Sequence, residues 1–344
     1  MNVAILANNS RSFVISMAEG LRCMLGRIGV DSAVFRDGLS MLAVLPPESS
    51  WKGRWRHWAW KTAHGVGFFH RLRAFDVIVV VGYLPMAFTR DWNVEWLRHV
   101  LPDKPVVLYA NYYLPTRYNW SKLVTFGMGR YDWYLCSSVV SACPLPSGPH
   151  PYSVIGIDLD DGALRPEQGG DFRALLDFER EGFAAHQKIQ IAALEETGTP
   201  YEVLQGALSR EDIRSIYRRT AIYFLAHVES FGWPVCELQA CGSYIMAAEA
   251  IWAQSHWIKD DLSKPGPGVH SPNIVVYDND KTLLKDKIRE IRESYDPKAV
   301  VETFRKHHPQ LFHGDTQALQ DFVDRVSVGE IHSRLHEQHR GLCS

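Results

Sequence analysis

The stretch 221–248, AIYFLAHVESFGWPVCELQACGSYIMAA, constrains the fold more than any other part of this 344-residue chain. It opens with a nearly continuous apolar run, Ala221–Ala226, which is typical of a strand buried on both faces of a parallel sheet. A polar turn follows, and Pro234 then stands where a helix can begin, because the first helical residue needs no N–H partner. Gly242 predicts the end of that helix, and Ser243–Ala248 predicts the next parallel strand.

The turn of this strand–loop–helix–strand unit carries two carboxylates. Glu229 precedes the turn and Glu237 lies inside the helix, with seven residues between them. The free N–H groups and the dipole at a helix start favour an anion such as a phosphate. Each carboxylate taken alone could have a purely structural role. Glu237 lies near a helix start, where the dipole favours a negative charge, and Glu229 could be an ordinary loop residue. The combination of the two carboxylates with the turn favours a binding site.

Eight residues of the stretch match a known signature in register: Glu229, Phe231, Gly232, Pro234, Glu237, Ala240, Cys241 and Gly242. The signature usually reads E-G-F-G-x-P-x-x-E-A-x-A-C-G-x-P-V, and Ser230 here takes the place of its first glycine. The stretch therefore resembles the Glu–seven residues–Glu signature of retaining GT-B glycosyltransferases, and especially that of glycosyltransferase family four.

The resemblance implies an α/β protein with the GT-B fold, in which two Rossmann-like doubly wound domains face each other across a cleft. Residues 1–148 would form the acceptor domain and residues 149–315 the nucleotide-sugar domain, and helices in 316–344 would return to the first domain. Independently of the resemblance, buried strands such as Asn2–Ala7 and Asp76–Val81 alternate with helical patterns, which favours doubly wound sheets.

The resemblance also implies roles for individual residues. Glu237 would accept hydrogen bonds from the ribose hydroxyls, and Glu229 would bind hydroxyls of the donor sugar. Arg180 and Lys188 are the nearest matches to the basic pair that neutralises the donor diphosphate, and Asn111 stands where the family often has a His. The other donor-binding positions lie in the turn: Ser230, Phe231, Gly232 and Trp233.

The function implied is that of a retaining hexosyltransferase-type enzyme. It would move a sugar from a UDP- or GDP-linked donor to a saccharide or lipid-linked acceptor, in the assembly of cell-surface polysaccharide, lipopolysaccharide or glycolipid. No Asp-x-Asp motif stands convincingly beside a strand, so we expect no metal and no cofactor. His332, His336 and His339 could line one helical face, but a solvated terminal helix is the favoured interpretation over a zinc site.

Two alternatives stay open. A nucleotide-sugar epimerase can share the GT-B architecture. A catalytically weakened paralogue could instead serve as a sugar-nucleotide-binding scaffold subunit. This alternative is favoured by Asn111, which stands in place of the family's usual His, and by a first loop without paired glycines.

Residues 51–73, WKGRWRHWAWKTAHGVGFFHRLR, hold four Trp and six Lys or Arg residues. On a helix, Trp51, Trp55 and Trp58 share one stripe, which suits the surface of an anionic membrane. The main alternative is a helix whose Trp face packs on the sheet, and a nucleic-acid surface is less favoured. The surrounding half of the chain is basic: residues 1–150 carry 16 Lys/Arg against 9 Asp/Glu, whereas residues 151–344 carry 21 against 30.

The content of 46 % hydrophobic and 22 % charged residues is typical of a soluble globular protein. The N-terminal residues lack the pattern of a secretory signal, and no apolar run reaches the length of a membrane-spanning helix. The six cysteines form no C-x-x-C pair, which indicates reduced thiols. We therefore expect a cytoplasmic protein, with peripheral attachment to the inner face of the membrane as an option.

Overall fold

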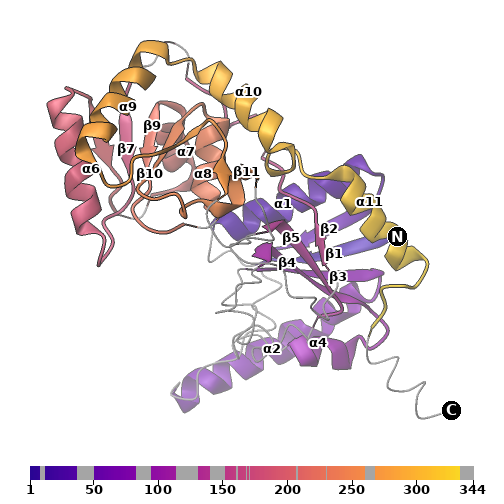
Figure 1. The fold of residues 1–344 in the computed structure, drawn as a ribbon. Helices are drawn as coiled ribbons and strands as arrows, with labels where there is room; N and C mark the ends of the chain where they lie inside the picture. Colours follow the sequence, from indigo (N-terminus) through magenta and orange to yellow (C-terminus); the bar gives the residue numbers. More distant parts are fainter. Residues whose placement is uncertain are drawn as a thin grey trace. The chain divides into compact units, whose positions relative to one another are not determined.

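The structure is a computed structural model, and two compact units make it up (Figure 1). The first comprises Met1–Val139, Pro146–Asp158 and Gly314–Ser344, and the second comprises Val140–Leu145 and Leu159–His313. The residues that the structure describes are 1–7, 12–36, 50–82, 94–113, 131–139, 152–159, 162–167, 169, 171–206, 208–229, 231–259 and 268–333.

The first unit contains a six-stranded sheet in the order β2-β1-β3-β4-β5-β6. Its strands are β1 (Asn2–Leu6), β2 (Asp31–Phe35), β3 (Val77–Gly82), β4 (Val106–Tyr113), β5 (Trp133–Val139) and β6 (Tyr152–Val154). Every pair is parallel, and Ile5 of β1 lies opposite Val34 on one side and Val79 on the other. All six residues of β3 are buried, as expected for a strand covered on both faces.

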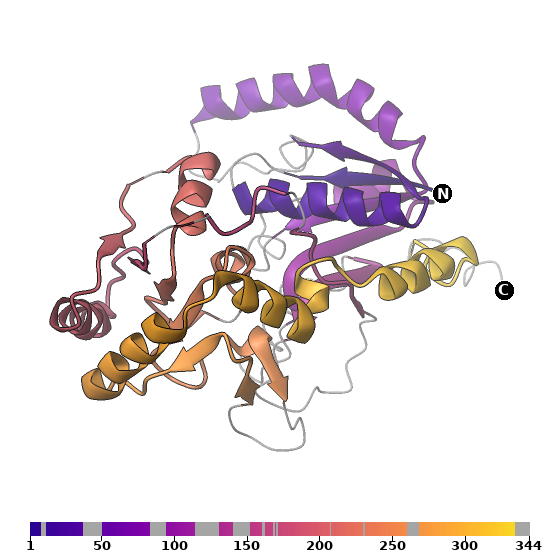
Figure 2. The ribbon, with the colours of Figure 1, turned by 90° about the horizontal axis from the view of Figure 1, so that it is seen from above.

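The helices of the first unit are α1 (Ser12–Arg27), α2 (Trp51–Leu72), α4 (Val94–Val100) and α11 (Thr316–Ser327). In the order β2-β1-β3 the chain runs from β1 to β2 on one side and then back to β3 on the other, so right-handed crossovers place α1 and α2 on opposite faces of the sheet. Figure 2 shows the strands between these two helices. The α2 helix begins after Ser50, whose side chain accepts a hydrogen bond from the Gly53 N–H.

The last described helix, α11, packs against α1 within the first unit. Gly314 precedes it with a φ of 75°, and a side chain there would collide with Met24 of α1. The Asp315 N–H donates to the Ile155 carbonyl at 2.7 Å, and the Asp315 carboxylate caps the helix through the N–H of Ala318. The positive φ favours glycine at this position, where the chain turns into α11 beside α1.

The second unit contains a five-stranded parallel sheet in the order β13-β10-β9-β7-β8. Its strands are β7 (Ala174–Leu176), β8 (Tyr201–Val203), β9 (Ile222–Phe224), β10 (Tyr244–Ala247) and β13 (Ile274–Val276). A separate antiparallel pair consists of β11 (Trp257–Lys259) and β12 (Val269–His270).

The helices of the second unit are α6 (Ala184–Glu196), α7 (Arg210–Arg218), α8 (Trp233–Ala240), α9 (Lys281–Ser294) and α10 (Pro297–His307), with the 3₁₀ turns η3 (Gln254–His256) and η4 (Pro309–Leu311). α6 packs beside α9, and α10 packs against α8. Gly242, predicted to end α8, has a φ of 92°, and a Cβ there would lie 2.6 Å from that of Pro297. This position therefore allows α10 to approach the end of α8 closely.

Candidate functional site

The strand order of the second sheet locates its ligand-binding edge. β8 lies on one side of β7 and β9 on the other, so the topology switches direction between β7 and β9. In open α/β sheets ligands bind outside the carboxyl ends of the strands at such a switch point. Asp177 directly follows β7, and the loop from His227 to Gly232 follows β9, so both belong to this edge. In the first sheet the switch lies between β1 and β3, where residues 8–11 and 83–93 fall outside the described part.

Gly232 sets the path of the chain from β9 into α8. It is the N-cap residue of α8 and has a φ of 62°, a left-handed conformation that favours glycine. A Cβ at this position would lie 2.5 Å from Cγ2 of Val235 and 2.9 Å from Cγ of Glu229. The glycine therefore lets the loop turn tightly enough to bring Glu229 against the start of α8.

Glu237 is buried in α8 and forms an ion pair with Arg214 of α7. Nε and Nη2 of Arg214 both donate to Oε1 of Glu237, at 3.0 and 2.7 Å. The two side chains are only 10 % and 8 % exposed. A charge-assisted contact between buried partners holds the carboxylate in one orientation. Arg214 thus positions the residue that the sequence signature assigns to the nucleotide.

A second pair of carboxylates, Asp177 and Glu229, meets at the switch point. Burial raises the pKa of Glu229, and the charge of Asp177 acts in the same direction. The His227 charge, a hydrogen bond from the Gly232 N–H and the Arg180 charge all act to lower it. Burial likewise raises the pKa of Asp177. Two carboxyl groups with perturbed pKa values at one sheet edge are typical of a functional site.

A fully buried histidine, His256, packs against Phe231 in the loop between β9 and α8. Its Nε2 lies 2.8 Å from the Phe231 carbonyl oxygen, and its ring stacks on the Phe231 ring. Nδ1 lies 3.3 Å from Nε2 of Gln239. Burial lowers the pKa of His256 to about 3, so its ring is neutral at physiological pH. The contacts then assign the proton to Nε2, which donates to Phe231, while Nδ1 accepts from the Gln239 amide.

The support continues into the core of the second unit. The Asn273 amide donates to Oε1 of Gln239 at 3.3 Å and to the Val300 carbonyl at 2.9 Å. Gln239, Asn273 and His256 are all buried. A hydrogen-bonded network of this kind rigidifies the core when its members are satisfied. This network connects the loop between β9 and α8 to the first turn of α10.

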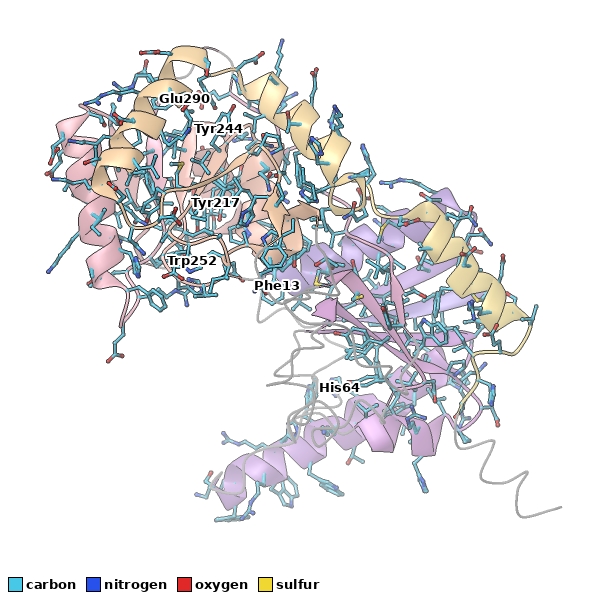
Figure 3. All side chains as sticks on the ribbon, viewed as in Figure 1. Phe13, His64, Tyr217, Tyr244, Trp252 and Glu290 are labelled. Atoms are coloured by element: carbon cyan, nitrogen blue, oxygen red, sulfur yellow. The ribbon has the colours of Figure 1, made fainter. Side chains whose placement is uncertain are left out.

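Aromatic rings cover the side of the site toward α6. Phe183 stacks with His186 and meets the edges of His227 and Trp252, with ring centroids 5.8 to 6.3 Å apart. Trp252, labelled in Figure 3, is only 1 % exposed, so its indole is buried among these rings. The Trp252 indole N–H is buried and has no acceptor among the described residues. The backbone N–H of the next residue, Ala253, donates to the Glu229 carbonyl, which connects this segment to the loop after β9.

The structure brings together some of the predicted site residues. Glu229, Phe231, Gly232 and Trp233 lie at the junction of the β9 loop and α8, and Arg180 lies near enough to Glu229 to influence its charge. Lys188 is exposed on α6, and in the described part of the chain no hydrogen bond or ion pair joins it to either glutamate.

Two predicted residues have no described side chain. Ser230 falls outside the described residues, and Asn111 lies in β4 of the first unit, where only its backbone is described. The structure therefore gives no geometry for either side chain.

Four residues of the site are not specified by the sequence signature and are not predicted from it: Asp177, Arg214, Gln239 and His256. The helical pattern predicts that α7 buries Ile213, Ile216 and Tyr217. Ile216 and Tyr217 are indeed buried, but Ile213 is only half-buried and Arg214 takes a buried place instead. An ion pair across two helices explains the buried arginine, and periodicity alone cannot reveal such a partner.

The site can hold an anionic, hydroxyl-rich ligand through N–H groups at the start of α8 and carboxylate oxygens around it. Within the described ranges, no group of three or more His, Cys, Asp or Glu side chains is arranged to hold a metal ion.

Comparison with known proteins adds information on the fold. No family model matches the sequence, and no curated protein matches it. Among solved structures, the UDP-GlcNAc 2-epimerase of Neisseria meningitidis bound to UDP-GlcNAc is similar, with a TM-score of 0.55 at 10 % identity over 94 % of this chain and 100 % of that one. A putative UDP-N-acetylglucosamine 2-epimerase from Listeria monocytogenes has a TM-score of 0.52 at 11 % identity over 95 % of each chain. The Anabaena HepE protein in complex with UDP has a TM-score of 0.49 at 12 % identity, over 95 % of this chain and 100 % of that one.

These similarities, together with the two parallel sheets, show that the chain has the GT-B fold. The prediction of an α/β protein with two Rossmann-like domains is confirmed. At these levels of identity the likeness shows the fold alone.

Proposed function

We propose that this chain is a glycosyltransferase that binds a nucleoside-diphosphate sugar at the carboxyl edge of its second sheet. The observation that carries the proposal is the placement of Glu237, a buried carboxylate that Arg214 holds in α8, eight residues after Glu229 at the switch point. A helix start next to two carboxylates offers N–H donors for a diphosphate and acceptors for sugar hydroxyls.

Each part of the donor has a counterpart in this arrangement. Glu237 accepts the ribose hydroxyls, and Glu229 accepts hydroxyls of the transferred sugar. The N–H groups at the start of α8 face the diphosphate, with Arg180 as the nearby cation and Lys188 as the second. When the sugar leaves, negative charge builds on the diphosphate, and preorganised donors stabilise it without a metal.

The buried indole N–H of Trp252 supports the same assignment. A buried donor without a partner is costly, and a bound ligand or water that accepts its hydrogen bond removes the cost. In the described part of the chain this donor has no protein acceptor, and the backbone N–H of the following residue, Ala253, donates to the Glu229 carbonyl. The hydroxyl groups of a donor sugar are suitable acceptors.

The finer assignment follows the sequence signature. We propose transfer with retention, as in glycosyltransferase family four, from a UDP- or GDP-linked hexose to a saccharide or lipid-linked acceptor. The product would belong to cell-surface polysaccharide, lipopolysaccharide or glycolipid. Asn111 would contribute to the acceptor side from the first unit.

A second candidate function is epimerisation of a nucleotide sugar. The supporting observation is the likeness of fold to two UDP-GlcNAc 2-epimerases, one of them bound to UDP-GlcNAc. The perturbed carboxyls of Asp177 and Glu229 would then exchange protons with the bound sugar.

One experiment separates the candidates. The protein is incubated with UDP-, GDP- and ADP-sugars, with and without saccharide acceptors, and the products are followed by NMR. Released nucleoside diphosphate with a glycosylated acceptor, or slow hydrolysis of the donor, supports the transferase. An isomerised nucleotide sugar supports the epimerase, and binding without turnover supports a scaffold subunit. Absence of binding to every donor contradicts all three.

A further inference from the structure

The first half of helix α2 contributes little to the core of its own unit. The buried residues of this 22-residue helix are Gly65, Phe68, Phe69 and Leu72, which all lie in its second half. Three indoles of the first half are instead more than half exposed: Trp51 at 68 %, Trp55 at 61 % and Trp58 at 61 %. The alternative that this Trp face packs on the sheet is therefore wrong.

The exposed indoles form one stripe along the helix. At 3.6 residues per turn, Trp51, Trp55 and Trp58 fall within an arc of about 60°. The rings of Trp55 and Trp58 are in contact, with centroids 6.3 Å apart. Val66, 76 % exposed, continues the stripe by two further turns. Large apolar side chains gathered on one exposed face mark an interaction surface.

The charge of α2 indicates what this surface meets. The helix carries five Lys or Arg residues and no Asp or Glu. By helical geometry Lys52 and Arg56 flank the Trp stripe on one side, and Arg54 and Lys61 flank it on the other. A stripe of indoles between two rows of cations matches an anionic lipid surface, where indoles lie at the level of the headgroups.

A groove extends the same face toward the end of the helix. A cavity of about 420 Å³ is lined by apolar residues of α2, among them Gly65, Val66 and Phe69, and by the basic side chains of Lys61, His70 and Arg73. A lining that combines apolar and basic side chains fits a phospholipid, whose headgroup carries the negative charge and whose chains are apolar.

No helix among the described residues is long and apolar enough to cross a membrane. Figure 3 shows α2 at the edge of the first unit, with its side chains spread outward.

We propose that the first half of α2 docks the protein on an anionic phospholipid membrane, with Trp51, Trp55 and Trp58 at the headgroup level. This interaction is independent of the donor chemistry proposed above, and it does not require that the chain transfers a sugar.

The test is co-sedimentation of the full chain with vesicles of phosphatidylcholine containing about 30 % phosphatidylglycerol. We expect binding to these vesicles, weaker binding at about 0.5 M salt than at about 0.1 M, and little binding to pure phosphatidylcholine. Replacing Trp51, Trp55 and Trp58 together by Gln should weaken binding at least about tenfold. The double variant Lys52→Gln/Arg56→Gln should weaken it about 30-fold.

Two controls separate this surface from general effects. Trp60→Gln changes an indole on the opposite side of α2, and Lys287→Gln/Arg289→Gln removes two exposed cations of α9. Both should bind anionic vesicles within about twofold of the wild type, since these residues lie outside the stripe. The circular dichroism and melting temperature of each variant are measured to verify that it is folded.

Three results would overturn the proposal. The first is failure of the wild-type chain to sediment with anionic vesicles. The second is undiminished binding by the triple Trp variant. The third is binding to a single-stranded oligonucleotide that is tighter than binding to vesicles, which would assign the surface to nucleic acid.

Discussion

The buried imidazole of His256 makes the second unit sensitive to acid. Burial lowers the pKa of His256 from 6.5 to about 3, and the neighbouring His308 has its pKa lowered to about 4. In the unfolded chain both rings take up a proton as the pH falls through 6.5, whereas in the folded unit they stay neutral. The unfolded state then binds more protons, so the stability of the folded unit decreases as the pH is lowered.

The expected magnitude follows from these values. One pH unit corresponds to about 1.4 kcal/mol for each proton that only the unfolded state binds. Between pH 6.5 and 4.5, His256 therefore accounts for a loss of about 2.3 kcal/mol in the free energy of unfolding. Its effect continues toward pH 3, whereas that of His308 ends near pH 4.

The variant His256→Gln isolates this contribution. Its amide can still donate to the Phe231 carbonyl, but the group does not titrate. We expect its free energy of unfolding in urea to depend less on pH than that of the wild type, by about 1.4 kcal/mol per pH unit between pH 6 and 4.5. Labelling of the buried thiol of Cys236, whose sulfur lies 4.0 Å from Nε2 of His256, reports unfolding of this unit directly.

His332→Gln is the matched control because His332 is exposed. It should leave the pH dependence unchanged. Equal slopes for the wild type and His256→Gln would refute the assignment of a buried neutral imidazole behind the binding loop.

Two further predictions concern the binding loop and the ion pair. Gly232→Ala should lower the free energy of unfolding by about 1–3 kcal/mol more than Gly206→Ala, because both have positive φ but only Gly232 is crowded by neighbours; equal losses in urea unfolding would contradict the crowding. Arg214→Met should cost about 3–5 kcal/mol, since it leaves the Glu237 carboxylate buried without its partner, and adding Glu237→Leu should recover most of the loss. If the free energy of unfolding of Arg214→Met lies within about 1 kcal/mol of that of the wild type, the pair is not buried as described.

The sequence predicts the parallel-sheet architecture well because the signals are local. The apolar run at 221–226 and Gly242 mark β9 and the end of α8 directly, and the structure has both. Capping is equally local: at the start of α7 the Ser209 hydroxyl accepts a hydrogen bond from the Asp212 N–H and donates one to the Asp212 carboxylate. Such features depend on neighbouring residues alone, so one sequence is enough to find them.

The support of the site is not predictable in the same way. Arg214 reaches Glu237 across 23 positions, and His256 reaches Phe231 across 25. Nothing in the spacing of these residues marks them, because their partners are brought together by the order of the strands. The sequence signature predicts roles for Glu229 and Glu237, whereas the residues that hold Glu237 and the loop before it become visible only in the fold.

The central claim is that Glu237 binds the nucleotide part of a donor at the edge of the second sheet. Calorimetric titration of UDP and GDP into the wild type and Glu237→Gln tests it most directly, with Glu202→Gln, which alters an ion pair with Arg219 in the same unit, as the control. We predict that at least one nucleotide binds the wild type and the control equally and binds Glu237→Gln more weakly by about 1.5–3 kcal/mol, or roughly 10- to 150-fold. Unchanged affinity of a folded Glu237→Gln variant for every nucleotide that binds the wild type would contradict the claim.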